Sequence, residues 1–240
     1  MPKHLFISDL HLSPERPDII RLFIDFLNTQ ASQARSLYIL GDLLEYWLGD
    51  DDQASGLNDV FTCMKQKADS GLKIYLMHGN RDFLMGEQLA SRTGCTLINE
   101  PYIVKFNNTS VLLMHGDILC TDDVRYQELR LMLRNPAWQQ DFLSKPLAER
   151  EQMARALRQQ SKEETQSKAE NIMDVNADAV TQAFNENNVS IMIHGHTHRP
   201  AIHTLTVNDR AAKRIVLGDW YKQGSVLEFS SPENFELKSF

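Results

Sequence analysis

The sequence predicts an α/β fold in which helices cover the faces of mainly parallel sheets. Short apolar runs rich in strand-forming residues recur along the chain, and stretches with helical spacing, at 18–33 and 58–70, separate the early ones. Strands that alternate with helices form such layered folds. With 240 residues and 42% hydrophobic residues, the chain has enough apolar material for one large core. We therefore expect a single domain, residues 1–240.

The expected strands follow one another along the chain. In order they are LFIS, LYIL, KIYLM, TLI, VLLM, SIMI, RIVL and VLEF. After about residue 199 the pattern changes to IHTLTV, RIVLGDW, SVLEFS and FELKSF, with few helical residues between them. Closely spaced strands of this kind predict a closing antiparallel section.

Residues 123–187 differ from the rest, because they contain almost no strand pattern and much Arg, Lys, Glu, Gln, Ala and Leu. We expect a helical insert, or cap, within the domain. Between residues 125 and 168 there are nine Lys or Arg and six Asp or Glu, a local charge of +3, so the remainder carries −10. Two interpretations stay open: a solvated helix pair, or a cap that meets an anionic substrate or membrane.

Charge and cysteine content exclude several classes of protein. A net charge of −7 argues against general nucleic-acid binding, which usually needs a basic surface. The three cysteines form no CxxC pair, so a disulfide framework or thiolate zinc site is not expected. No signal-peptide core and no run of 18 apolar residues is present. We expect a cytoplasmic chain that is soluble or attached to a membrane surface.

Polar residues follow five of the expected strands. In order, the residues are Asp9 and His11; Gly41 and Asp42; His78, Gly79, Asn80, Arg81 and Asp82; His115, Gly116 and Asp117; His194, Gly195, His196 and His198. Ligands of α/β sheets bind outside the carboxyl ends of strands, so we expect these side chains to meet at one edge. Each fragment alone is weak evidence, but five in order predict a metal site.

The kinds of side chain indicate which metals fit. Carboxylate, amide and imidazole ligands without thiolate suit Mn, Fe or Zn. Seven candidate ligands exceed the needs of one tetrahedral ion, so two ions bridged by the central Asp42 are expected. Such ion pairs clamp both oxygens of a phosphoryl displacement and activate water. Because alternate residues of an extended chain point the same way, His194, His196 and His198 could converge; a metal, a catalytic base and chance remain open explanations.

The order D-x-H, G-D, G-N-R-D, H-G-D, G-H-x-H resembles the calcineurin-like metallophosphoesterase superfamily. The longer stretches ISDLHL, LYILGDLLEYWLGDD, HGNRDFLMG, LLMHGDILCTDD, IMDVN, IHGHTHRPA and RIVLGDW are similar to one family within it, the UDP-2,3-diacylglucosamine pyrophosphatases of bacterial lipid A synthesis. The resemblance spans nearly the whole chain. It implies a four-layer α-β-β-α sandwich with a helical cap insert.

The resemblance also implies the site, residue by residue. One Mn²⁺ would be held by Asp9, His11, Asp42 and His198 and a second Mn²⁺ by Asp42, Asn80, His115 and His196. The implied catalytic residues are Asn80, Arg81 and His196. The implied substrate contacts are Asn80, Arg81, Asp123, Ser161, Thr165, Lys168 and His196. Thr165 departs from the pattern, where Asn is expected. His194 falls outside the ligand set and is interpreted as support for it.

The implied reaction is hydrolysis of UDP-2,3-diacylglucosamine at the α-phosphorus by metal-activated hydroxide, giving UMP and 2,3-diacylglucosamine 1-phosphate. Because the substrate is a lipid, we expect the protein to work peripherally at the cytoplasmic side of the inner membrane. We also expect a monomer that binds no nucleic acid. Arg81 is expected to contact phosphate; a surface ion pair with Asp82 is the alternative. The alternative functions are a general dimetal phosphodiesterase or nucleotide phosphatase, and a binding module that reuses the fold.

Three further groups are expected near the site. Apolar surface for acyl chains is expected from Trp47, Phe83, Leu84, Met85, Leu131, Met132, Leu133, Trp138, Phe142 and Leu143, each of which could instead be core. Basic residues expected to face anionic lipid are Arg125, Arg130, Arg134, Arg150, Arg155 and Arg158. The run Asp50–Asp52 is expected to be a solvated loop rather than a cation site.

Overall fold

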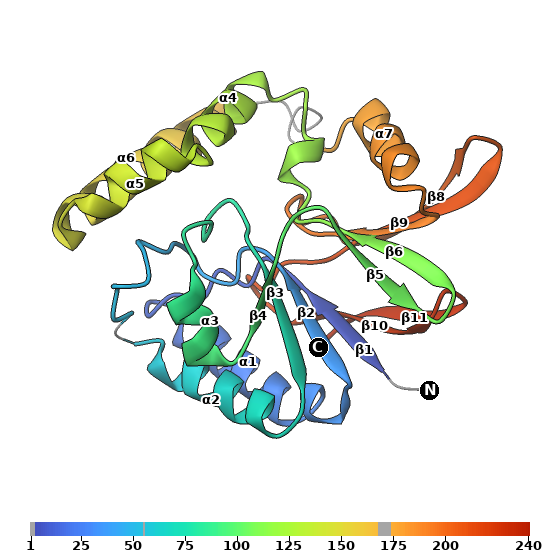
Figure 1. The fold of residues 1–240 in the computed structure, drawn as a ribbon, viewed down its shortest axis with the longest axis horizontal. Coiled ribbons are helices and arrows are strands. Elements are labelled where there is room, and N and C mark those ends of the chain that lie inside the picture. The colour runs from blue at the N-terminus through green and yellow to red at the C-terminus, as the bar shows by residue number, and fades with distance from the viewer. Residues whose placement is uncertain (1–2, 55, 168–173) are drawn as a thin grey trace.

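The computed structural model describes residues 3–54, 56–167 and 174–240, with the backbone alone over 160–167. Two mixed sheets lie face to face (Figure 1). The first has the strand order β11-β10-β1-β2-β3-β4 and the second the order β5-β6-β7-β9-β8. Strands β1 to β4 are parallel, whereas β10 and β11 join the first sheet antiparallel, as the closing section predicted.

The strands have the following bounds. They are β1 His4–Ile7, β2 Ser36–Leu40, β3 Lys73–Met77, β4 Thr96–Ile98, β5 Tyr102–Phe106, β6 Thr109–Leu113, β7 Ile191–His194, β8 Ala201–Val207, β9 Arg210–Val216, β10 Ser225–Ser231 and β11 Asn234–Ser239. Strand β2 is buried along its whole length, as expected for a parallel strand covered on both faces. All eight expected apolar runs lie in or overlap these strands, and β5 is an addition.

The helices have the following bounds. They are α1 Pro17–Asn28, α2 Asn58–Asp69, α3 Glu87–Thr93, α4 Val124–Leu133, α5 Pro136–Ser144, α6 Leu147–Ser167 and α7 Ala177–Asn187. Helix α1 starts with a proline at its first turn and buries one stripe that includes Phe23 and Phe26. It ends at Asn28, short of the expected 18–33, because the chain turns into a 3₁₀ helix at Ala31–Gln33. Helix α3 was not expected.

Three apolar clusters hold four layers together. Helices α1 and α2 pack on the outer face of the first sheet through residues such as Phe23, Val60 and Phe61. Phe6, Leu113 and Ile193 belong to the cluster between the two sheets. Helix α7 packs on the outer face of the second sheet through Phe184. The expected α/β fold is confirmed, and its layers are helices, sheet, sheet and helix.

Helices α4, α5 and α6 lie outside these layers, above the loops of the first sheet (Figure 1). Polar contacts connect them to the sandwich. Arg134 of α4 donates to the carbonyl of Gly79 over 2.9 Å, and Arg150 of α6 donates to the carbonyl of Leu48 over 2.6 Å. Within the part of the chain that the structure describes, no helix is long and apolar enough to cross a membrane.

Candidate metal centre and adjoining pocket

The loops that follow β1, β2, β3, β6 and β7 carry the predicted ligand residues to one place. Both sheets contribute, so the site lies where their carboxyl ends meet. Close packing of these loops requires glycine. A Cβ atom at Gly79 would lie 2.0 Å from Asp42 Oδ1, and one at Gly195 would lie 2.4 Å from Asp9 Oδ2. The glycines therefore let the ligand loops approach one another.

Two overlapping groups of side chains could each hold an ion. Ligand atoms of Asp9, His11 and His198 lie within 4.8 Å of one another, as do those of Asp9, Asp42 and His115. Asp42 spans them, since its Oδ2 lies 3.7 Å from His11 Nε2 and its Oδ1 lies 3.8 Å from His115 Nε2. This is the arrangement of a carboxylate between two ion sites.

Asn80 and His196 complete the second group. Asn80 Oδ1 lies 3.0 Å from His115 Nε2 and 3.1 Å from His196 Nδ1. The structure thus brings all seven predicted ligand residues into one cluster. Its donors are carboxylate oxygens, one amide oxygen and imidazole nitrogens, a set that divalent first-row metals prefer.

Buried polar atoms in the cluster test whether these residues fit a metal. Asp9 Oδ1 and His11 Nε2 are buried and make no hydrogen bond to any residue that the structure describes. Burying polar atoms without partners is costly, and native proteins avoid it. Both atoms face the other ligand atoms, so a divalent cation would satisfy them. The residues present therefore fit a metal centre.

Outer partners orient three of the histidines. His11 Nδ1 lies 3.1 Å from Glu45 Oε2, His115 Nδ1 lies 2.9 Å from the Leu40 carbonyl oxygen, and His198 Nδ1 lies 3.8 Å from Asp219 Oδ2. Such partners set ring orientation and raise the basicity of the nitrogen that faces the metal. Glu45 and Asp219 were not predicted, although both stand in stretches, LLEYW and LGDW, that carry the family resemblance.

The neighbouring imidazoles of His115 and His196 differ in pKa because their electrostatic surroundings differ. Burial lowers the pKa of His115, but the carboxylates of Asp42 and Asp117 outweigh burial and raise it to about 9. Burial and the charge on His115 lower the pKa of His196 to about 4. The carboxylates therefore hold a proton on His115 at neutral pH, and metal binding must displace it.

His194 does not converge with His196 and His198 and lies outside the ligand cluster, as the resemblance implies. Its Nδ1 lies 2.9 Å from the Gly195 carbonyl oxygen and its Nε2 accepts from Arg214 Nη1 over 3.1 Å. The chain leaves the strand at His194, and His196 and His198 take positive φ angles of 67° and 55°, so the strand alternation does not continue. Burial and Arg214 lower the pKa of His194 to about 3, which leaves a neutral ring that braces the ligand loop.

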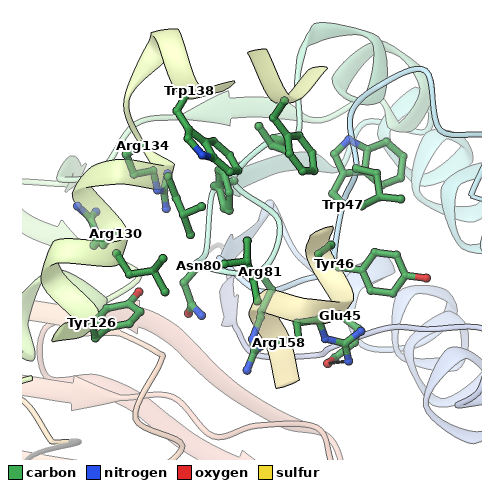
Figure 2. Close-up of a pocket in the computed structure, with 18 residues that line it drawn as sticks. Glu45, Tyr46, Trp47, Asn80, Arg81, Tyr126, Arg130, Arg134, Trp138 and Arg158 are labelled. Carbon is green, nitrogen blue, oxygen red and sulfur yellow. Dashed lines mark hydrogen bonds and ion pairs between the residues drawn. The ribbon is translucent and has the colours of Figure 1, made fainter. Parts of the chain in front are cut away.

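A pocket opens beside the centre, between the loops after β2 and β3 and the helices α4, α5 and α6. Figure 2 shows Trp47 and Trp138 toward one end of it and Arg81, Glu45 and Arg158 toward the other. Its apolar lining consists of Trp47, Leu48, Phe83, Leu84, Leu129, Leu133, Trp138, Phe142, Ala154 and Leu157. Asn80 lines the same pocket, so the apolar space reaches the metal centre.

Arg81 and Asp82 have separate surroundings. Asp82 is fully buried and accepts hydrogen bonds from the backbone of Gly79 and Leu44 over 2.8 and 3.2 Å. Arg81 lines the pocket and donates its backbone N–H to Asp42 Oδ1 over 2.9 Å. The alternative of a surface ion pair between Arg81 and Asp82 is therefore wrong.

The predicted contacts on the cap fall in different places. Asp123 stands before α4 and accepts from the backbone N–H of Tyr126 over 3.2 Å. The backbone of Ser161 and Thr165 lies in α6, but their side chains and the whole of Lys168 lie outside what the structure describes.

Several basic and acidic residues of the cap region are not where we expected them. Arg130 pairs with buried Asp117, and Arg150 is 2% exposed against Asp51, so neither faces lipid. Asp50 is not solvated, because it accepts from the backbone at the start of α3, including Gly86 over 2.9 Å. Arg134 likewise turns inward. These charged side chains interact with free backbone N–H and C=O groups or with buried side chains of opposite charge. Composition alone does not predict which of them do so.

The expected acyl-contact residues divide into two sets. Trp47, Phe83, Leu84, Leu133, Trp138 and Phe142 line the pocket, whereas Met85 is buried and lies outside its lining. Leu131, Met132 and Leu143 are exposed and are not part of the pocket wall.

Comparisons with known proteins agree with this site. The model of the calcineurin-like phosphoesterase family matches residues 2–200. A UDP-2,3-diacylglucosamine hydrolase of Ectopseudomonas mendocina is 50% identical over 98% of this chain and 97% of that protein. A UDP-2,3-diacylglucosamine hydrolase of Marinobacter nauticus is 49% identical over 98% of this chain and 96% of that protein. The structure of an archaeal phosphodiesterase superimposes on this chain with a TM-score of 0.50 over 99% of each chain. The two are 13% identical in sequence, so the superposition shows the shared fold.

The family model spans the ligand loops from Asp9 to His198 and the cap helices between them, and the relatives extend the similarity to the last strands. An intact set of metal-binding side chains also argues against a binding module that has lost its chemistry. The chain belongs to the calcineurin-like phosphoesterase family and, within it, groups with the UDP-2,3-diacylglucosamine hydrolases.

Proposed function

We propose that the chain hydrolyses UDP-2,3-diacylglucosamine in lipid A biosynthesis, with attack at the α-phosphorus. The products are UMP and 2,3-diacylglucosamine 1-phosphate. The observation that carries this proposal is the apolar pocket that opens directly onto Asn80 and Arg81. A substrate with long acyl chains next to a pyrophosphate needs an apolar pocket beside phosphate-binding residues. The activity of a general phosphodiesterase would not require the apolar pocket. The relatives that are about half identical carry the same activity in their names.

In this proposal the seven clustered residues would hold two Mn²⁺ ions, and Asp42 would be shared between them. When bound, such ions neutralise charge on the phosphoryl oxygens and make water a stronger nucleophile. The residues of the chain do the rest. Asn80 and His196 orient the α-phosphoryl group, and the Arg81 guanidinium contacts its oxygens from the pocket side. Glu45 and the Leu40 carbonyl hold His11 and His115 in place.

We also propose that helices α4–α6, part of the insert expected at 123–187, cover the lipid and contact the membrane. The pocket is closed on one side by α4 and α6 residues such as Leu133 and Leu157. On α4, Val124 and Leu131 are 62% and 70% exposed, and Arg125, next to Val124 in the chain, is also exposed. Because all seven ligand residues come from one chain, a monomer working peripherally at the cytoplasmic side of the inner membrane suffices. Asp123, Ser161, Thr165 and Lys168 remain proposed contacts to the sugar and its phosphate.

The reaction is tested by incubating the Mn²⁺-loaded protein with UDP-2,3-diacylglucosamine in H₂¹⁸O. Attack at the α-phosphorus places the label in UMP, and label in the lipid phosphate would contradict it. A second arm compares Leu133→Arg, which puts a charge into the pocket, with Ile202→Arg on exposed β8. Leu133→Arg should lose the lipid substrate while it retains hydrolysis of bis(p-nitrophenyl) phosphate. Equal losses on both substrates would favour a general phosphodiesterase.

A further inference from the structure

A second cleft reaches the metal centre next to the apolar pocket. The two share Glu45, Tyr46 and Arg158 as a wall. His11 lines the second cleft, whereas Asn80 lines the apolar pocket, so the clefts approach the centre from either side of this wall. The volume of the second cleft is about 440 Å³, within the usual range for small-molecule sites.

The two clefts differ in chemistry. The second has no aliphatic lining; besides His11 and the shared wall it is formed by Ser13, Glu15, Arg16, Arg155 and Tyr221. The lining thus contains three guanidinium groups, two phenol rings and two carboxylates, from Arg16, Arg155, Arg158, Tyr46, Tyr221, Glu15 and Glu45. An apolar group would gain little here, whereas a polar molecule with a phosphate and a planar ring has matching partners.

Tyr221 provides the flat surface. Its ring lies parallel to the His11 imidazole, with centroids 5.3 Å apart and an interplanar angle of 6°. The backbone that carries it is held, because Arg16 donates to its carbonyl over 2.7 Å and its own N–H donates to Asp219 over 2.9 Å. The residue is still 44% exposed, so part of a fixed aromatic ring remains open beside the centre.

The arginines that line this cleft come from separate segments. Arg155 and Arg158 stand on α6, and Arg16 immediately precedes α1. Arg155 is bonded to Glu151 of the same helix over 2.6 Å, in a pair whose Arg side chain is 73% exposed. Exposed pairs of this kind are weak, so the guanidinium can turn to a phosphate at little cost.

We propose that this cleft binds the nucleotide half of the substrate, with the pyrimidine base stacked on Tyr221 and the ribose phosphate near Arg16 and Arg155. The inference rests on the proposed function, which requires a nucleotide on one side of the attacked phosphorus and a lipid on the other. The apolar pocket accounts for the lipid, and the polar cleft across the Glu45–Arg158 wall accounts for the nucleotide.

The test measures binding by calorimetry, using the Mn²⁺-loaded protein with UMP and, in parallel, with ribose 5-phosphate, which lacks the base. Tyr221→Ala should weaken UMP about tenfold, as expected for loss of one base–ring stack, and leave ribose 5-phosphate unchanged. Tyr221→Phe keeps the ring and should bind UMP like the native protein. Arg155→Ala should weaken both ligands, whereas Arg21→Ala, at an exposed position of α1, should change neither.

Two results would overturn the cleft assignment. One is an unchanged affinity of Tyr221→Ala for UMP. The other is an equal loss for UMP and ribose 5-phosphate, since that would mean Tyr221 acts only by supporting His11. Failure of the proposed function is recognised separately: the native protein would then bind UMP through Tyr221 but would not hydrolyse UDP-2,3-diacylglucosamine.

Discussion

Left-handed backbone conformations position five of the seven proposed ligand residues. They are Asp9, His11, Asp42, His196 and His198, with φ between 49° and 67°. For a residue other than glycine this conformation costs about 1–2 kcal/mol. Hydrogen bonds between loops offset the cost; Asp9 N–H donates to the Gly41 carbonyl over 3.1 Å and His11 N–H to the Asp42 carbonyl over 3.0 Å. The loops therefore hold the ligand geometry through their own backbone.

Asp42 lies between the two candidate ion sites, with its carboxylate oxygens 3.7 Å from His11 Nε2 and 3.8 Å from His115 Nε2. We predict that Asp42→Ala loses Mn²⁺-dependent turnover while the protein stays folded, because the bridging carboxylate is gone but the apolar clusters are intact. The measurement is turnover of UDP-2,3-diacylglucosamine together with a far-UV circular dichroism spectrum. Normal Mn²⁺-dependent activity in this variant would rule out the two-ion arrangement.

Glu45 contacts His11, one of the proposed metal ligands. Burial raises the pKa of Glu45, but its interaction with the His11 imidazole outweighs burial and keeps the pKa below its usual value, so Glu45 is ionised. We predict that Glu45→Gln weakens metal affinity or activity about 10–100-fold, the usual effect of removing an outer partner. Activity titrated against Mn²⁺ checks this, with Glu149→Gln on the exposed side of α6 as control. Identical titration curves for both variants would show that Glu45 does not orient His11.

At the scale of elements, α4 is joined to the loop that carries His115. Asp117 of this loop is fully buried and accepts from Tyr126 OH over 2.7 Å and from Arg130 Nε over 2.8 Å. Gln127 also donates to the Asp117 backbone carbonyl over 2.8 Å. One turn of α4 therefore attaches the cap to the metal centre.

We predict that Arg130→Met destabilises the protein by about 3–5 kcal/mol, since it removes the guanidinium that is bonded to the buried Asp117 carboxylate. Urea unfolding measures the effect, and Arg125→Met, on the exposed face of the same helix, should stay within about 0.5 kcal/mol of the native protein. If both variants unfold alike, the ion pair contributes nothing to the attachment of α4.

Helix α4 also exposes Leu131, which is 70% accessible. We predict that Leu131→Glu reduces binding to vesicles that contain anionic lipid, because it replaces apolar contact area with a charge that the membrane repels. Sedimentation with vesicles measures binding, and Ile202→Glu on β8 serves as the control. Equal binding of the native protein and Leu131→Glu would show that this face of the cap does not meet the membrane.

For the whole molecule, the metal centre concentrates negative charge in the interior. Burial raises the pKa of Asp82 to about 6, and the neighbouring Asp42 carboxylate adds to the shift. We predict that Mn²⁺ at a hundred times its Kd adds about 2.7 kcal/mol of stability and raises Tm by roughly 5–10 °C over EDTA-treated protein. Asp42→Ala should lose most of this shift. A native Tm that is the same in Mn²⁺ and EDTA would contradict a metal centre in this cluster.

The sequence predicts the arrangement of the sheets better than the contacts of the cap. Parallel strands are continuous apolar runs, and the polar residues that follow them must meet at one edge, so Asp42, Asn80 and His115 could be grouped from the sequence. Helix partners on the cap could not be predicted. Arg125 and Arg130 are five residues apart on α4, yet one is exposed and the other is bonded to Asp117.

By itself the sequence determined the order of the strands and helices apart from β5 and α3, the residues available to a metal, and membership of the phosphoesterase family, because these depend on local pattern and residue type. Only the tertiary structure decided that His194 faces Arg214, that Asp50 caps α3, and that Tyr221 flanks His11. Each of these contacts either joins segments that are distant in the chain or depends on a left-handed backbone conformation. Packing between the layers selects such arrangements, whereas local residue preference does not.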